Sequence, residues 1–214
     1  MGDWPKCLLE RDGMPLIERT VRLLLDAGTR PVVVVLGHHA AQIEPVLRRV
    51  RETGRDPDAL RWVVNPNPDV GPGGSLRAGL AALPHEVPAV LVALADQPLL
   101  CDGDVDDLLR AWRARGADVA LLVPRFGGQP GHPLVFDARV GEAVRAQPPA
   151  QGLRDWRLQH PQQVAWLDVA HPRHTTDADT LDDLARLARE HHVRLRRRLP
   201  EADSHPDGMG RFLR

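Results

Sequence analysis

The sequence predicts an α/β fold in which a mostly parallel sheet carries helices on both faces. Apolar runs alternate with amphipathic stretches from near the start of the chain to about residue 190. The two strongest runs, residues 31–36 and 89–95, contain no polar residue, which is typical of strands buried on both sides. Strands and helices that alternate in this way usually build parallel sheets between layers of helices.

The first half of the chain follows this alternation. Residues 16–27 carry leucine, isoleucine and valine at helical intervals, and Gly28 closes that helix. The further elements expected in order are a strand at 31–36, a helix at 40–50, a strand at 61–64, a Pro/Gly-rich loop and a helix at 76–83.

The second half continues in the same way. The expected elements are a strand at 89–95, a helix at 104–115, a strand at 117–123, a loop at 124–133, a strand at 134–136, a helix at 138–146, a strand at 163–169 and a helix at 181–198. Ligands of such sheets lie beyond the carboxyl ends of the strands. We therefore search the loops that follow Leu36, Val64, Ala95 and Val123.

Composition narrows the function classes. The 214 residues, 43% of them apolar, suffice for one domain, which we place at residues 1–190, followed by a polar, flexible tail at 191–214. A net charge of −1 gives no field that favours nucleic acid or an anionic membrane. No apolar run approaches the roughly 18 residues of a membrane span, and the two cysteines suit a reducing compartment. We expect a cytoplasmic protein that binds neither nucleic acid nor membrane.

Asp96 is the first candidate for chemistry. It directly follows the apolar run 89–95, so it lies at a strand end, and Pro98 stiffens the turn after it. Mg²⁺ prefers one or two carboxylates together with substrate phosphates. The alternative is that Asp96 caps the next helix, although Asp102 and Asp104 lie closer to that helix.

Two glycine-rich segments follow other strands. In the segment 65–80, Asn65, Gly71, Gly74 and Ser75 precede or open a helix, where backbone N–H groups can approach a phosphate or a base. Ser75 is equally a plain helix cap. In the segment 127–133, Gly131 and His132 can line a substrate pocket or form a simple turn.

The two ends of the chain hold further candidates. Asp177 and Asp179 precede the last predicted helix, where Asp179 or Thr180 can cap the helix or a carboxylate can serve as a second ligand to the metal at Asp96. Near the start, Gly2 and Lys6 can meet phosphates, with Lys6 as a mobile point charge.

Taken in order, these motifs resemble the MobA-like nucleotidyltransferases, and most of all the molybdenum-cofactor cytidylyltransferases of the xanthine dehydrogenase accessory type. The resemblance covers about residues 1 to 190 and rests on the following pieces: Gly2-x-x-x-Lys6-x-Leu8-Leu9, Val33–Gly37, Asn65-Pro66, Gly71-x-x-x-Ser75-Leu76-x-Ala78-Gly79-Leu80, Ala95-Asp96-Gln97-Pro98, Gly131-His132-Pro133 and Asp177-x-Asp179-Thr180. It implies a Rossmann-like three-layer fold of the nucleotide-diphospho-sugar transferase type.

The resemblance also implies a reaction and a role for each motif. Such enzymes use Mg²⁺ to transfer a nucleoside monophosphate from an NTP, here CTP or GTP, to a phosphorylated acceptor such as molybdopterin, and they release pyrophosphate. A molybdoenzyme or its chaperone is the implied protein partner. Lys6 corresponds to the triphosphate lysine and Asp96 to the principal metal ligand, with Asp179 as the second. Gly2, Asn65, Gly71, Gly74 and Ser75 correspond to the nucleotide loops, and Gly131 and His132 to the acceptor side.

Two segments depart from the family pattern. The family begins with a buried strand and a Leu-Ala-Ala-Gly-x-x-x-Arg-Met-Gly loop, whereas this chain opens at Met1-Gly2. Either the chain is truncated at its N-terminus or the protein has lost NTP binding, and the retained Lys6, Ser75 and Asp96 favour truncation. We therefore expect the 214-residue chain to be poorly stable or inactive as it stands. Gly152 and Arg154 remain from the family's Gly-Asp-x-Gly-x-Arg, but its aspartate is missing, which leaves the acceptor open.

Two other functions compete with the transferase. A degenerate accessory or binding protein would keep the fold without catalysis. An oxidoreductase is disfavoured, because no Gly-x-Gly-x-x-Gly followed by an acidic residue is present.

Overall fold

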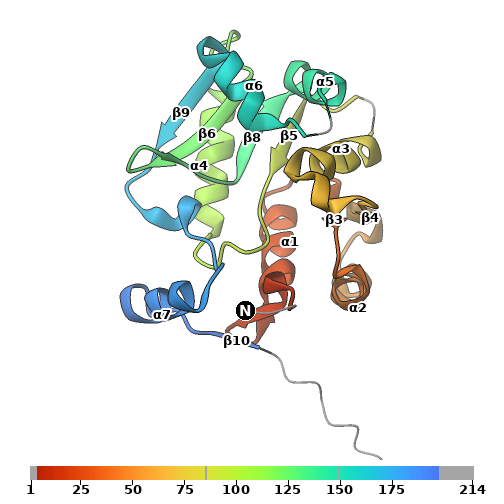
Figure 1. Ribbon diagram of the computed structural model, residues 1–214, viewed down its shortest axis with the longest axis vertical. Helices are drawn as coiled ribbons and strands as arrows, with labels where there is room; N and C mark the ends of the chain where they lie inside the picture. Colours follow the sequence, from red (N-terminus) through yellow and green to blue (C-terminus); the bar gives the residue numbers. More distant parts are fainter. Residues whose placement is uncertain (1–3, 85, 149, 198–214) are drawn as a thin grey trace, which may run out of the picture.

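The fold is built around two neighbouring groups of strands with helices on either side (Figure 1). The computed structural model describes residues 4–84, 86–148 and 150–197. The helices are α1 (Leu16–Asp26), α2 (Ala40–Thr53), α3 (Pro72–Ala82), α4 (Asp102–Arg113), α5 (Ala138–Ala146), α6 (Leu153–Gln159) and α7 (Leu181–Glu190). The strands are β1 (Leu9–Arg11), β2 (Met14–Pro15), β3 (Val32–Leu36), β4 (Leu60–Val64), β5 (Ala89–Val92), β6 (Leu121–Phe126), β7 (Gln129–Pro130), β8 (Leu134–Asp137), β9 (Val164–Asp168) and β10 (Leu195–Arg197).

The long strands run mostly in one direction. β3 and β4 pair in parallel, and β6 and β9 pair in parallel in a second sheet whose main order is β5-β8-β6-β7. β5 and β6 both pair antiparallel with β8, so β5, β6 and β9 point the same way. β8 is reversed because the chain returns to it through the short β7 segment rather than through a crossover helix.

Successive side chains along the strands of the second sheet pack against different layers of helices. Leu121 and Val123 of β6 pack in the cluster that contains α5 and α6, whereas Leu122 packs against α4. In β8, Phe136 likewise packs in the cluster with α5 and α6, and Val135 packs against α4. This period of two places one helix layer on each face, which confirms the predicted α/β sandwich.

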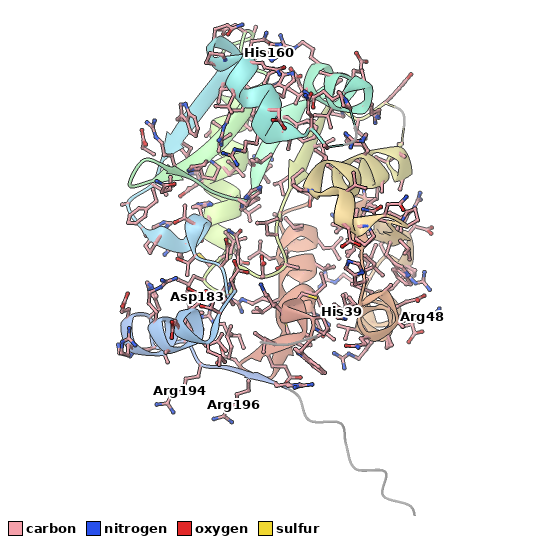
Figure 2. The ribbon with its side chains drawn as sticks, in the orientation of Figure 1. His39, Arg48, His160, Asp183, Arg194 and Arg196 are labelled. Carbon is pink, nitrogen blue, oxygen red and sulfur yellow. The ribbon has the colours of Figure 1, made fainter. Side chains whose placement is uncertain are left out.

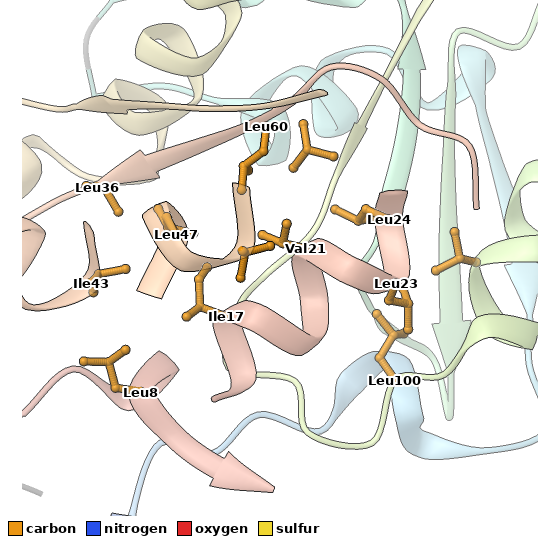
Figure 3. Close-up of a cluster of buried hydrophobic side chains, with 13 residues drawn as sticks. Leu8, Ile17, Val21, Leu23, Leu24, Leu36, Ile43, Leu47, Leu60 and Leu100 are labelled. Carbon is orange, nitrogen blue, oxygen red and sulfur yellow. The ribbon is translucent and has the colours of Figure 1, made fainter. Parts of the chain in front are cut away.

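The core on the other side joins the two strand groups. α1 and α2 bury apolar residues against β3, and Leu91 of β5 packs against the same cluster. Figure 3 shows Val21 and Leu24 on α1, with Leu47 of α2 and Leu60 of β4 nearby. A single helix, α1, therefore contributes to the core beneath both sheets.

Three of the predicted elements need correction. The strand expected at 89–95 ends at Val92 and is half-buried instead of fully buried, because within the described residues β5 pairs with β8 on one edge only. The strand expected at 117–123 is β6, displaced to Leu121–Phe126. The helix expected from residue 76 begins at Pro72, since proline is well suited to a first helical position.

The prediction of a helix over 181–198 is wrong after Glu190. His192 has a left-handed backbone with φ of 55°, and Val193 returns its N–H to the Leu187 carbonyl, which ends α7. Residues 195–197, which we assigned to a flexible tail, instead form β10 against β1. Residues 198–214 of the predicted tail lie outside the described residues. Within those that are described, no helix is long and apolar enough to cross a membrane.

Candidate functional site

Asp96 lies in the turn after β5 and is half-buried. Its Oδ1 is shielded from water and accepts no hydrogen bond from the described residues. Burial raises the pKa of Asp96, and the nearby charge of Asp177 raises it further. The Asp96 carboxylate does not cap α4, because Cys101 occupies the cap position and Asp104 completes its capping box. An unpartnered carboxylate oxygen of this kind is suited to a cation.

Asp177 lies beside Asp96. The backbone N–H of Ala178 donates to the Asp96 carbonyl at 3.0 Å, which fixes the 177–179 segment against the end of β5. Gln97 Nε2 donates to Asp177 Oδ1 at 3.1 Å and to the His174 carbonyl at 2.9 Å. Burial also raises the pKa of Asp177. The paired acidic side chains at this strand end are therefore Asp96 and Asp177.

Asp179 has a different partner. Lys6 Nζ and Asp179 Oδ1 form an ion pair at 2.7 Å, with 40% and 53% of the two side chains exposed, so water screens the pair. The hydrogen bond that Lys6 donates to Asp179 raises the pKa of Lys6. Thr180 is the N-cap of α7, and Asp183, labelled in Figure 2, closes its capping box. Asp179 is thereby free of the capping role and available to Lys6.

Gly131 and His132 are connected to the Asp96–Asp177 centre through His174. The His132 N–H donates to the His174 carbonyl at 2.9 Å, and His174 Nδ1 donates back to the His132 carbonyl at 3.0 Å. A Cβ at Gly131 would lie 2.8 Å from the His174 Cβ, so only glycine permits this approach. Burial lowers the pKa of His132 to about 4, with help from the charge of Arg157, which keeps its imidazole neutral at pH 7.

Asn65, Gly71, Gly74 and Ser75 form a second cluster at the end of β4. Asn65 is buried, its N–H donates to the Leu36 carbonyl at 2.8 Å, and its Nδ2 donates to Ser75 Oγ at 3.1 Å. Gly71 is the N-cap of α3 with φ of 110°, a backbone that disfavours other residues. Ser75 lies inside α3 and does not cap it. The first turn of α3 thus presents backbone N–H groups beside small residues.

Helix α6 connects the two clusters. A Cβ at Gly152, its N-cap, would lie 3.3 Å from Gly73 Cα in α3, so the two backbones touch. Arg157, on the same helix, is close enough to His132 for its charge to affect that pKa. Arg77 of α3 also donates to the Gln151 carbonyl at 3.1 Å. α6 was absent from the sequence prediction, although it carries Gly152 and Arg154 of the family pattern.

Known proteins share sequence similarity with most of this chain. The family model described as the MobA-like NTP transferase domain matches residues 1–164. The chain belongs to this family of MobA-like NTP transferases. A curated relative, nicotine blue oxidoreductase of Paenarthrobacter nicotinovorans, is 34% identical over 198 residues, which cover 87% of this chain and 89% of the relative.

Solved structures share the fold of this MobA-like domain. Rv0371c from Mycobacterium tuberculosis H37Rv has a TM-score of 0.67 at 23% identity, with 86% of this chain and 89% of that chain covered. That protein has also been solved in complex with manganese. The molybdopterin-guanine dinucleotide biosynthesis protein A from Archaeoglobus fulgidus has a TM-score of 0.58 at 19% identity, with 86% of this chain and 89% of that chain covered. Rossmann-like three-layer architecture is therefore common to all of them.

The MobA-like chain brings together most of the residues that the sequence singled out. Lys6, Asp96 and Asp179 surround one centre, to which His174 joins Gly131 and His132. Gly2 lies outside the described residues. The sequence offered Asp177 and Asp179 as alternative second ligands, and the resemblance favoured Asp179, whereas the structure holds Asp177 beside Asp96 and pairs Asp179 with Lys6. In the described part of the chain, no three His, Cys, Asp or Glu side chains are grouped to hold a metal alone.

Proposed function

We propose that this MobA-like protein transfers a nucleoside monophosphate from CTP or GTP to a phosphorylated acceptor of the molybdopterin type. The observation that carries the proposal is Asp96, whose water-shielded Oδ1 lacks a partner beside Asp177. A half-buried carboxylate pair at a strand end is suited to a divalent cation that also binds substrate phosphates. The protein would bind the NTP and the acceptor in the cytoplasm. Its protein partner would be a molybdoenzyme or its chaperone.

The reaction needs no protein nucleophile. An oxygen of the acceptor phosphate bonds to the α-phosphorus of the NTP, and the bond between that phosphorus and the α,β-bridging oxygen breaks. The electron pair leaves with pyrophosphate. Charge accumulates on the transferred phosphoryl oxygens and on the leaving group, so positioning and charge neutralisation account for most of the catalysis.

Asp96 and Asp177 fit a metal better than Asp96 and Asp179 do. Asp177 is fixed by Gln97, lies in the segment bonded to the Asp96 carbonyl, and its charge has the larger effect on Asp96. Asp179, whose first partner is Lys6, would be an outer ligand. When bound, Mg²⁺ would neutralise phosphate charge.

Lys6 would exchange one anion for another. In the described structure its ammonium is held by Asp179, on the side of the centre where the triphosphate would lie. The pair is half-exposed, so a polyphosphate can replace the carboxylate at small energetic cost. Asp179 would thus keep Lys6 near the site until the nucleotide binds.

The α3 cluster supports a nucleotide loop. Gly71, Gly74 and Ser75 leave the first turn of α3 uncrowded, and helix N-termini favour anions and polar groups. Asn65 fixes Ser75 and the end of β3 in one hydrogen-bonded unit. On the acceptor side, the neutral His132 and the compact Gly131 turn would position the acceptor without adding charge.

Calorimetric titration of CTP and of GTP in the presence of Mg²⁺ tests the proposal. We expect one nucleotide to bind to the wild type, and Asp96→Asn to abolish Mg²⁺-dependent pyrophosphate release while the fold is kept. Asp106→Asn, an exposed carboxylate on α4, is the matched control and should behave as the wild type. If neither nucleotide binds, the protein is the degenerate accessory or binding protein instead.

The relative named nicotine blue oxidoreductase gives a second candidate, an oxidoreductase activity on that dye. An assay of NADH and NADPH oxidation with nicotine blue distinguishes it from nucleotidyl transfer. Turnover that depends on the dye and survives Asp96→Asn would favour the redox activity.

A further inference from the structure

A cavity with both basic and apolar lining lies beside the turn that follows Asp96. Its volume is about 350 Å³, and it opens between the Asp96–Cys101 turn, α1, the segment 171–173 and the segment after α7. The basic side chains that line it are Arg11, Arg19, His171, Arg173 and His191. Leu99 and Val193 supply an apolar part of the wall, and no carboxylate side chain lines the cavity. This is the composition of an anion site.

The three arginines at this cavity differ in their partners. Arg173 donates from Nε and Nη2 to Asp104, which is 2% exposed beneath it. Arg11 Nε lies 3.4 Å from the strongly exposed Asp12 carboxylate, and Arg11 Nη1 donates to the Pro98 carbonyl. Arg19 forms no ion pair or hydrogen bond with the described residues, and its Nε is shielded from water without an acceptor. The terminal amino groups of a guanidinium group without a carboxylate partner can donate to a phosphate.

His171 adds unused donor capacity to the same wall. Its Nε2 accepts from Arg173 Nη2 at 2.6 Å. Its Nδ1 has no hydrogen-bond partner among the described residues. Asp104 holds Arg173, which in turn donates to His171, so the wall is pre-organised before a ligand arrives.

The cavity shares its walls with the proposed metal centre without overlapping it. Leu99 follows Asp96 and Gln97 on one turn, and the segment from His171 to Asp177 serves both sites. Arg11 donates to the Pro98 carbonyl, in the middle of that turn. An anion that draws Arg11 or Arg173 inward would therefore shift the groups that position Asp177.

We propose that this cavity binds a small phosphate-bearing molecule at a site separate from the Asp96–Asp177 centre. Phosphate matches the paired N–H donors of several arginines, and the cavity volume leaves space for a short carbon chain against Leu99 and Val193. The inference does not depend on the proposed transferase activity.

Calorimetric titration with inorganic phosphate and with glycerol 3-phosphate, in the presence of EDTA, tests the site. Arg19→Gln should weaken binding roughly tenfold by removing the free guanidinium group. Arg19→Lys keeps the charge without the fork and should give an intermediate affinity. Arg194→Gln is the matched control, because Arg194 is exposed, follows Val193 and points away from the molecule (Figure 2).

Lys6→Ala separates this cavity from the nucleotide centre. We expect phosphate binding to persist in Lys6→Ala and in Arg194→Gln, and to fall in Arg19→Gln with unchanged thermal unfolding. Tighter binding of glycerol 3-phosphate would identify an organic phosphate, and equal affinities would identify free phosphate. The proposal is overturned if neither anion binds, if Arg19→Gln binds as the wild type does, or if Lys6→Ala abolishes binding.

Discussion

Lys6 and Asp179 are 173 positions apart in the chain, yet Lys6 Nζ lies 2.7 Å from Asp179 Oδ1. The two ends of the described chain therefore meet beside Asp96. The family match ends at residue 164, so the acidic segment 177–179 is placed at the centre by the tertiary structure. The MobA-like domain depends on this C-terminal segment to complete its candidate site.

Asp96→Asn is expected to stabilise the metal-free protein at neutral pH. Burial and Asp177 raise the pKa of Asp96, so the folded state binds the proton more tightly than the unfolded chain does. Stability from this group is present at low pH and is lost as pH rises through the raised pKa. Thermal unfolding should show that the advantage of the variant grows from acid to neutral pH.

The wild type and Asp96→Asn also test metal binding. Mg²⁺ should raise the unfolding temperature of the wild type, because a ligand that binds only the folded state stabilises it, and should not affect Asp96→Asn. If Asp96→Asn is less stable than the wild type at pH 7 when both are free of metal, the assigned environment of Asp96 is contradicted.

Arg173→Gln is expected to destabilise the protein by about 3 kcal/mol or more, because it leaves the carboxylate of Asp104 buried without its cation. Arg110→Gln removes an arginine from an exposed pair with Asp107 on the same helix as Asp104. That control should change stability by less than about 1 kcal/mol. Urea unfolding of both variants measures the difference, and equal effects would show that Asp104 does not rely on Arg173.

Gly131→Ala should destabilise the protein by roughly 1–3 kcal/mol, since its methyl group would collide with His174. Gly103→Ala, in the first turn of α4, meets nothing within 4 Å and should be neutral or slightly stabilising. Chemical denaturation compares the two. A neutral Gly131→Ala would mean that the turn and the His174 segment can separate freely.

Acid should destabilise the protein through His132. Its folded pKa of about 4 lies below the usual 6.5, so the folded state resists protonation. The stability from this group is complete above pH 6.5 and is lost as pH falls towards 4, by on the order of 2–3 kcal/mol. His132→Gln should flatten the unfolding profile between these pH values. An unchanged profile would place the acid sensitivity elsewhere, for instance at His174, whose pKa burial also lowers.

The fold class and the strand ends at which to search follow from the amino-acid sequence. Apolar periodicity is a local property, so α1, α5 and β3 lie close to their predicted bounds. Asp96 was recognisable because a carboxylate that directly follows an apolar run lies at or shortly beyond a strand end, and it lies in the turn that follows β5. The glycines of α3 and Gly131 were recognisable for a similar local reason, since close backbone approach requires a residue without a side chain.

Tertiary structure alone decided which carboxylates meet. Asp177 and Asp179 are equivalent in the sequence, but the backbone bond from Ala178 to Asp96 places Asp177 against the strand end and leaves Asp179 to Lys6. The reversal of β8 and the pairing of β10 with β1 are likewise set by contacts between distant segments. Local periodicity specifies which residues are buried, whereas the partners of polar groups depend on which segments the packed core brings together.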